Sequence, residues 1–273
     1  MTGTGVTGHD PRVNPLEAGL SALAAGFVVA IVTTPVGVSG AVFLLPIHLD
    51  VLGVPSPAVT PTNLLFNVVA TPGALVRHHR TGSLGGPLTS RLLVGTVPGV
   101  IVGSVLRVYA TPGEAVFRIL AACLLGPLGL WLVLRRPRPP APETTAGPAR
   151  ATITALGFVV GVVGGIYGIG GGSLLGPVLV GLGLPLAAVA PAALASTFVT
   201  SVAGVATYGV LSLVSTGPVA PEWAIGILCG VGGLLGGYLG ARLQPRVPEK
   251  ALRILLGLLA VGLAAAYLVA ALT

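Results

Sequence analysis

The sequence predicts an all-α integral membrane protein of two inverted repeats, each of about four helices, with the first helix of each repeat broken or re-entrant. Three observations predict it: scarce charge, long apolar blocks, and a pattern that occurs twice. Only 8% of the 273 residues are charged and the mean hydropathy is +0.98, whereas an ordinary soluble domain carries roughly 25% charged residues. So few charges cannot cover the surface of a soluble protein of this size.

The apolar residues fall into blocks long enough to cross a bilayer, which takes roughly 20 residues per helix. A polar tail precedes them, and a Pro- and Arg-rich linker interrupts them, as is typical of a boundary between two units. The predicted parts are the tail 1–15, a first transmembrane repeat 16–134, the linker 135–150 and a second repeat 151–273. The blocks are Leu16–Leu49, Ala58–Val76, Leu88–Tyr109, Ala115–Leu134, Ala151–Val180, Leu186–Val214, Ala224–Leu243 and Ala251–Leu272.

The two halves share a sequence pattern. The run that begins at Gly26 and reads GFVV occurs again at Gly157, and at the same offset Pro46 corresponds to Pro177. Glycine accounts for 42 residues, so isolated glycine matches carry little weight, but an ungapped run of Gly, Phe and Val is harder to obtain by chance. Near the end of each half, Arg107 corresponds to Arg242. We interpret the halves as a duplication.

The first block of each half contains an interruption. As one straight helix, Leu16–Leu49 would be about 50 Å long, too long for a single span. The segment 33–40, TTPVGVSG, lies near its middle, and the corresponding place in the second half reads GGIYGIGGGS over 164–173. Proline removes a backbone donor and glycine is a poor helix former. The sequence therefore predicts a broken helix or hairpin at both places.

The distribution of charge predicts the topology. A broken first helix gives each half an odd number of crossings, three or five, and odd halves are inverted relative to each other. The Arg-rich connections 77–91, 135–150 and 242–250 then share one side, which the positive-inside rule makes cytoplasmic, with both termini outside. This arrangement also explains a net charge of +7 in which 13 of the 14 basic residues are arginine, without nucleic acid as a partner.

Interrupted helices at a repeat interface are typical of secondary transporters. A half-helix start leaves backbone N–H groups unpaired, and these attract anions. Hydroxyl and amide side chains nearby could bind further oxygens, and the alternative role for all these residues is helix packing and interhelical hydrogen bonding. No acidic residue lies deep in a block, which disfavours a cation site and leaves the coupling ion, a proton or sodium, open. The predicted substrate-binding residues are Thr33, Thr34, Ser39, Gly40, Asn63, Asn67, Gly170, Gly171, Gly172, Ser173, Ser196 and Thr197.

The duplicated glycine-rich block resembles the sulfite exporter TauE/SafE family of anion permeases. The resemblance lies in Gly157–Pro177, GFVVGVVGGIYGIGGGSLLGP, and in Gly232–Leu243, GGLLGGYLGARL, and it covers nearly the whole chain, Leu16–Leu272. It implies a bacterial or archaeal inner-membrane permease for small sulfur oxyanions or organosulfonates such as sulfite, with two repeats of about four helices. Some members of the family carry unrelated organic anions. The first half departs from the family's consecutive glycines, so the transferred site rests on Gly170–Ser173.

Two other kinds of function fit the sequence less well. A membrane-embedded enzyme acting on lipid would need a carboxylate pair or a nucleophile beside a base, and only His78 and His79 in a basic loop offer such material. A non-transporting membrane partner protein stays an alternative, because small residues throughout permit helix contacts. We expect no enzyme activity, no cofactor and no metal site. The expected partners are a small anion and the lipid bilayer, and a homo-oligomer is left open.

Overall fold

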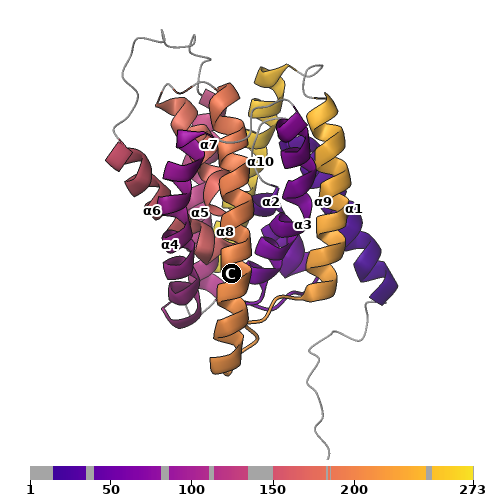
Figure 1. Ribbon diagram of the computed structural model, residues 1–273. Helices are drawn as coiled ribbons and strands as arrows, with labels where there is room; N and C mark the ends of the chain where they lie inside the picture. The colour runs from indigo at the N-terminus through magenta and orange to yellow at the C-terminus, as the bar shows by residue number, and fades with distance from the viewer. Residues whose placement is uncertain are drawn as a thin grey trace, which may run out of the picture.

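A computed structural model describes residues 15–34, 40–80, 86–110, 114–134, 150–182, 184, 186–243 and 248–272. The regular structure in these ranges is entirely helical, as the sequence predicts (Figure 1). Within them, six helices are long and apolar enough to cross a membrane, and three shorter apolar segments accompany them. The chain is therefore an all-helical, multi-pass membrane protein.

Each half contains one interrupted helix and three uninterrupted ones. In the first half α1 is Pro15–Thr33, α2 Ala41–Pro46, the π-helical turn η2 Ile47–Val51, α3 Val59–Arg80, α4 Pro87–Tyr109 and α5 Glu114–Leu134. In the second half α6 is Arg150–Tyr167, α7 Gly171–Gly181, α8 Leu186–Val214, α9 Trp223–Leu243 and α10 Glu249–Leu272. The interruptions thus lie where the sequence predicts them, between α1 and α2 and between α6 and α7.

Helices α1 and α9 lie side by side and run in the same direction (Figure 1). A Cβ atom placed on Gly26 would lie 1.9 Å from the carbonyl oxygen of Cys229, and one on Gly236 would lie 2.2 Å from that of Phe27. Residue numbers therefore increase together along the two helices. Glycine lets the backbones approach this closely, as small residues commonly do in membranes.

Helices α4 and α6 form an equivalent pair from the opposite halves. A Cβ on Gly95 would lie 2.2 Å from the carbonyl oxygen of Thr154, and one on Gly103 would lie 2.1 Å from that of Val162. This pair is also parallel. Since α4 corresponds to α9 and α6 to α1 in the repeat, the same kind of contact occurs once for each half.

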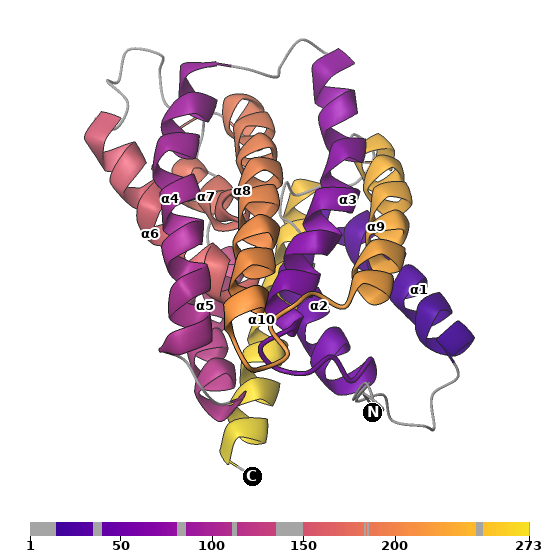
Figure 2. The same cartoon turned by 60° about the horizontal axis from the view of Figure 1, so that its bottom comes forward.

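Helices α3 and α8 occupy the middle of the bundle, with α4 and α6 beyond α8 and with α9 and α1 beyond α3 (Figure 2). Leu64 contacts the position of Gly204, and Thr60 lies beside Tyr208, so α3 and α8 are antiparallel. Helix α9 runs parallel to α3, and α4 runs parallel to α8.

Helices α5 and α10 are antiparallel as well. A Cβ placed on Gly126 would contact Ala264, and one placed on Gly129 would lie 2.7 Å from the carbonyl oxygen of Gly257. The repeat pairs α5 with α10, as it pairs α3 with α8. In both pairs, equivalent helices therefore point in opposite directions.

These directions place the basic residues of three helices at one end of the bundle. Arg91 lies in the first turns of α4, Arg150 opens α6, and Arg242 lies in the last turn of α9. At the other end, Arg118 of α5 forms an ion pair with Asp50 of η2, with 2.7 Å between the nitrogen and the oxygen. Arg91, Arg150 and Arg242, one from each Arg-rich connection, are thus grouped at one end, as expected from the sequence.

Candidate functional site

The interruption between α6 and α7 is built from glycine. Gly168 and Gly170 have φ angles of +73° and +70°, a left-handed conformation that costs other residues about 1–2 kcal/mol. A Cβ on Gly168 would also lie 2.3 Å from the carbonyl oxygen of Thr60. The chain can therefore stop, turn and restart as α7 here because side chains are absent.

The first turn of α7 packs directly on α8. A Cβ on Gly172 would lie 1.8 Å from the carbonyl oxygen of Ala193. The backbone N–H of Gly171 donates to Thr200 Oγ1 over 2.9 Å, so the protein itself binds one of the amides predicted to face a solute. The Ser173 hydroxyl donates to the carbonyl oxygen of Ile169. Packing thus accounts for Gly172, and internal hydrogen bonds occupy Gly171 and Ser173.

The interruption between α1 and α2 is described only at its two ends, Thr33–Thr34 and Gly40. Residues 35–39 are outside the described residues, so the predicted role of Ser39 lies there too. Thr33 ends α1 with its hydroxyl oxygen buried and without a hydrogen-bond partner in the described part of the chain, and Thr34 follows it. Gly40 lies against Val29, Thr33 and Phe66.

Helix α3 contacts both interruptions. Asn63 donates from Nδ2 to the carbonyl oxygen of Ala41, at the start of α2, over 2.7 Å. One turn later, Asn67 donates from Nδ2 to the carbonyl oxygen of Gly168 over 3.4 Å. Both asparagines are at most 1% exposed. Helix α3 therefore connects the two interruptions, and of the predicted residues Asn63 and Asn67 are the ones placed between them.

Helix α8 presents a row of hydroxyl groups to the second interruption. Thr197 donates to the carbonyl oxygen of Ala193, and its Oγ1 lies 3.5 Å from that of Ser173. Ser196 lies 3.0 Å, oxygen to oxygen, from Thr96 of α4. The Ser201 oxygen lies 3.1 Å from the place where a Cβ on Gly170 would be, and it is buried without a partner in the described residues.

Besides the Tyr167 hydroxyl at the end of α6, three buried polar atoms near the two interruptions have no hydrogen-bond partner among the described residues: the Oγ1 of Thr33, the Oδ1 of Asn63 and the Oγ of Ser201. A buried polar group without a partner costs about 1–3 kcal/mol, so each is a candidate for binding a ligand or a water. The two hydroxyls can donate to an anion. None of the three carries a charge, so a solute held here would meet dipoles only.

Sequence reasoning missed some polar residues of this region. Thr71 is buried on α3 and follows Asn67 by four residues. The helical spacing that places Asn63 and Asn67 on one face of α3 also predicts that Thr71 lies on that face. Thr96 had no such signal, because its neighbours in sequence are apolar. Within the described residues, no group of three His, Cys, Asp or Glu side chains could hold a metal ion.

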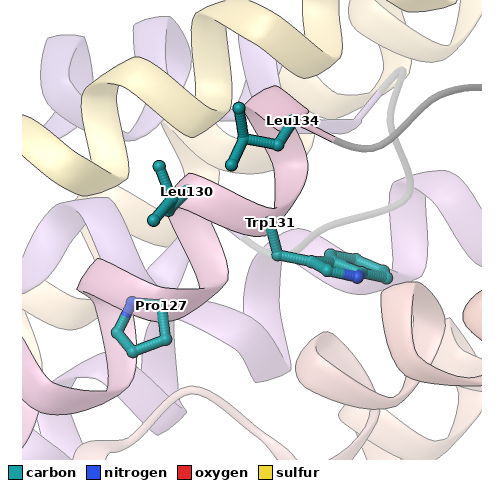
Figure 3. Close-up of a pocket in the computed structure, with 4 residues that line it drawn as sticks. All are labelled: Pro127, Leu130, Trp131 and Leu134. Atoms are coloured by element: carbon teal, nitrogen blue, oxygen red, sulfur yellow. The ribbon is translucent and has the colours of Figure 1, made fainter.

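A hollow also lies on α5. Pro127, Leu130, Trp131 and Leu134 line it, all from successive turns of that helix (Figure 3). Its lining is almost wholly apolar, which suits lipid or another hydrophobic surface rather than an anion. The helix interruptions remain the candidate site.

Comparison with known proteins gives one family. The model of the family described as "Sulfite exporter TauE/SafE" matches residues 22–267, which include every described helix at least in part. A search of curated proteins gives no match.

Proposed function

The chain belongs to the sulfite exporter TauE/SafE family, a family of membrane transporters, and on that basis we propose that it is a secondary carrier of small anions, namely sulfur oxyanions such as sulfite or organosulfonates. The proposed solute binds in the middle of the bundle, at the interruptions between α1 and α2 and between α6 and α7. The observation that carries the proposal is that Asn63 and Asn67, one turn apart on α3, each bind the backbone of one interruption.

We propose further that the two halves are inverted repeats, as the sequence predicts. Support comes from the helix directions, because α3 is antiparallel to its counterpart α8, and α5 to its counterpart α10. Antiparallel counterparts are what a two-fold axis in the plane of the membrane would produce. Such an axis gives the two interruptions equivalent access to opposite sides of the bilayer, as alternating access requires.

The proposed orientation places the end with Arg91, Arg150 and Arg242 in the cytoplasm and both termini outside, in a cell membrane. The positive-inside rule supports it, because basic residues near the ends of membrane spans remain on the cytoplasmic side. The linker 135–150 is then cytoplasmic and joins the repeats 16–134 and 151–273.

The proposed binding step exchanges internal hydrogen bonds for bonds to the solute. In the structure Asn67 and Thr200 bind the backbone at the second interruption, and Ser201 and Thr33 keep hydroxyls without partners. An oxyanion at this position would accept from these hydroxyls and from amide hydrogens at the start of α7. The donors at this position are neutral, so they bind the anion without a fixed charge.

Transport by the purified protein in lipid vesicles tests the proposal. We expect uptake of sulfite or a small sulfonate by the wild type and its loss in Asn67→Asp, which keeps the shape of the side chain and adds a negative charge. The matched control is Ser90→Asp, which adds the same charge at an exposed position in the first turn of α4.

The outcomes separate the alternatives. Uptake of carboxylates and not of sulfur anions would reassign the substrate to an organic anion. Suppose that sulfite, thiosulfate, sulfonates and carboxylates are not taken up and do not stabilise the protein thermally. This result would contradict a carrier and favour a membrane partner protein. If Asn67→Asp takes up sulfite as fast as the wild type, the solute does not bind at this site.

A further inference from the structure

Arg107 is buried inside the bundle, although it lies in the last turn of α4. Its side chain is 2% exposed, which places it among the largest fully buried side chains of the described residues. A charged group inside a membrane protein is costly, and where one occurs it commonly marks an ion pathway or binding site. Arg242, the corresponding residue of the second repeat, is exposed near the end of α9. The burial of Arg107 is therefore not a property that both repeats need.

Hydroxyl groups and aromatic rings surround Arg107. Its Nε donates to Thr60 Oγ1 over 3.4 Å, and one terminal nitrogen donates to the hydroxyl of Ser56. The guanidinium carbon lies 4.3 Å from the centre of the Phe117 ring, a favourable cation–π geometry. The Phe117 ring in turn lies 5.0 Å from that of Tyr167, the last residue of α6.

The Tyr167 Oη in this surrounding is buried without a hydrogen-bond partner among the described residues. The buried Ser104 Oγ lies beside the hydroxyl of Tyr208, which donates to the carbonyl oxygen of Gly165 over 2.8 Å. Ser104 precedes Arg107 by three residues, so the two share a face of α4, and its backbone nitrogen lies 2.9 Å from where a Cβ on Gly165 would be. Tyr167 interacts electrostatically with Arg107 and is followed directly by Gly168, where the interruption begins.

We propose that Arg107, Ser104 and Tyr167 form a second binding position for the transported oxyanion. It lies between the interruption at 168–170 and the end of the bundle at which α4 finishes. This inference rests on the proposed function, because it assumes that an anion passes the interruption. The planar guanidinium matches two oxygens of an oxyanion, and the two hydroxyls can donate to a third.

The two positions would act in series. The interruption offers neutral donors, which bind an anion weakly, whereas Arg107 offers a full charge beside it. An anion that leaves the interruption toward this end of the bundle would therefore meet the charge next. The same charge would exclude cations from this route.

Arg107 also lies near the carboxyl end of α6, where a positive charge stabilises the helix dipole. Thr60, which accepts from Arg107, donates in turn to the carbonyl oxygen of Ile166 over 3.0 Å. A purely structural role predicts that Arg107 variants lose thermal stability without any anion present. A binding role predicts a loss of the stabilisation that an anion adds, together with a higher KM for transport.

The test measures sulfite uptake in vesicles and the sulfite-dependent rise in Tm of the purified protein for Arg107→Gln, Ser104→Ala and Tyr167→Phe. We expect KM to rise at least about tenfold in Arg107→Gln and about threefold in each hydroxyl variant, since a charge-assisted hydrogen bond is worth more than a neutral one. The Tm of the two hydroxyl variants without anion should stay unchanged. Matched controls are Arg242→Gln, Tyr238→Phe on the exposed face of α9, and Ser212→Ala on α8.

A wild-type KM and a wild-type anion-dependent Tm rise in all three variants would overturn the inference while the carrier function stands. If Arg107→Gln does not fold, Ser104→Ala and Tyr167→Phe decide by the same criterion. Absence of transport and of anion binding in the wild type would instead overturn the proposed function, and the inference with it. Equal KM increases in the three controls would also count against a position specific to Arg107.

Discussion

The two helix interruptions occupy equivalent places in the repeat and are built differently. In the second half Gly168 and Gly170 take left-handed conformations, and the chain restarts at once as α7, which has 11 residues. In the first half Gly40 is right-handed, with a φ of −64°, and α2 has 6 residues before it passes into the π-helical turn η2. The second interruption depends on glycine conformation, whereas the described part of the first does not.

The neighbours of the two interruptions differ in the same way. Gly172 approaches the backbone of α8 directly, and its counterpart in the first half is Ala41, whose carbonyl oxygen is bound by the side chain of Asn63. Backbone contact is rigid, while a side-chain amide can change partners by rotation. We expect the α7 arm to stay fixed to α8 and the α2 arm to be the one that moves against α3 during transport.

The largest effect should follow from Gly172→Ala. The added Cβ would lie 1.8 Å from the carbonyl oxygen of Ala193, and neither backbone can yield without moving a whole helix. We expect a destabilisation of more than about 3 kcal/mol, beyond the usual cost of overpacking. Poor recovery of folded protein and a lower Tm in detergent would measure it.

Two other glycines provide the control for this variant. Gly209, on the neighbouring helix α8, and Gly262, on α10, have no atom within 4 Å of an added Cβ and have no left-handed φ. Gly209→Ala and Gly262→Ala should therefore keep the wild-type Tm or raise it slightly, since alanine favours helix. A Gly172→Ala protein as stable as these two would show that the contact with α8 is not rigid.

Gly170→Ala should have the next largest effect. It combines a left-handed conformation, which costs alanine about 1–2 kcal/mol, with a contact of 2.7 Å to the Thr197 Cγ2 atom. That neighbour is a side chain and can rotate, so most of the cost should come from the backbone. Circular dichroism at increasing temperature would measure it, and Thr197→Ser should relieve the steric part only.

Gly40→Ala sharpens the comparison, because Gly40 and Gly171 are equivalent in the repeat. Its added Cβ would lie 2.6 Å from the Val29 Cγ1 atom, at the edge of a side chain. We expect a loss of about 1 kcal/mol, of the size usual for mild overpacking. The double variant Gly40→Ala, Val29→Ala should recover most of the Tm. No recovery would mean that the first interruption is as rigid as the second.

The sequence was enough to predict the helical membrane class, the place of both interruptions and the residues of α3 and α8 that lie beside them. Apolar block length and the repeated run beginning at Gly26 and Gly157 carry this information locally. For Gly172 the sequence left substrate binding and helix packing as alternatives, because the choice depends on how close α8 comes. The burial of Arg107 was not predictable, since its counterpart Arg242 is exposed and only the fold distinguishes them.

The smallest effect on stability should come from Ser201→Ala, although it lies on the same turn of α8 as Thr200. The Ser201 hydroxyl is buried without a partner in the described residues, so its removal relieves a desolvated group. Thr200 accepts from the Gly171 N–H, and Thr200→Val should cost about 1–2 kcal/mol by leaving that amide unsatisfied. We therefore expect Ser201→Ala to keep or raise the Tm while the KM for sulfite rises, and Thr200→Val to lower the Tm. Because the two substitutions remove one hydroxyl each, a lower Tm in Ser201→Ala with an unchanged KM would show that this hydroxyl holds the interruption in place rather than binding the anion.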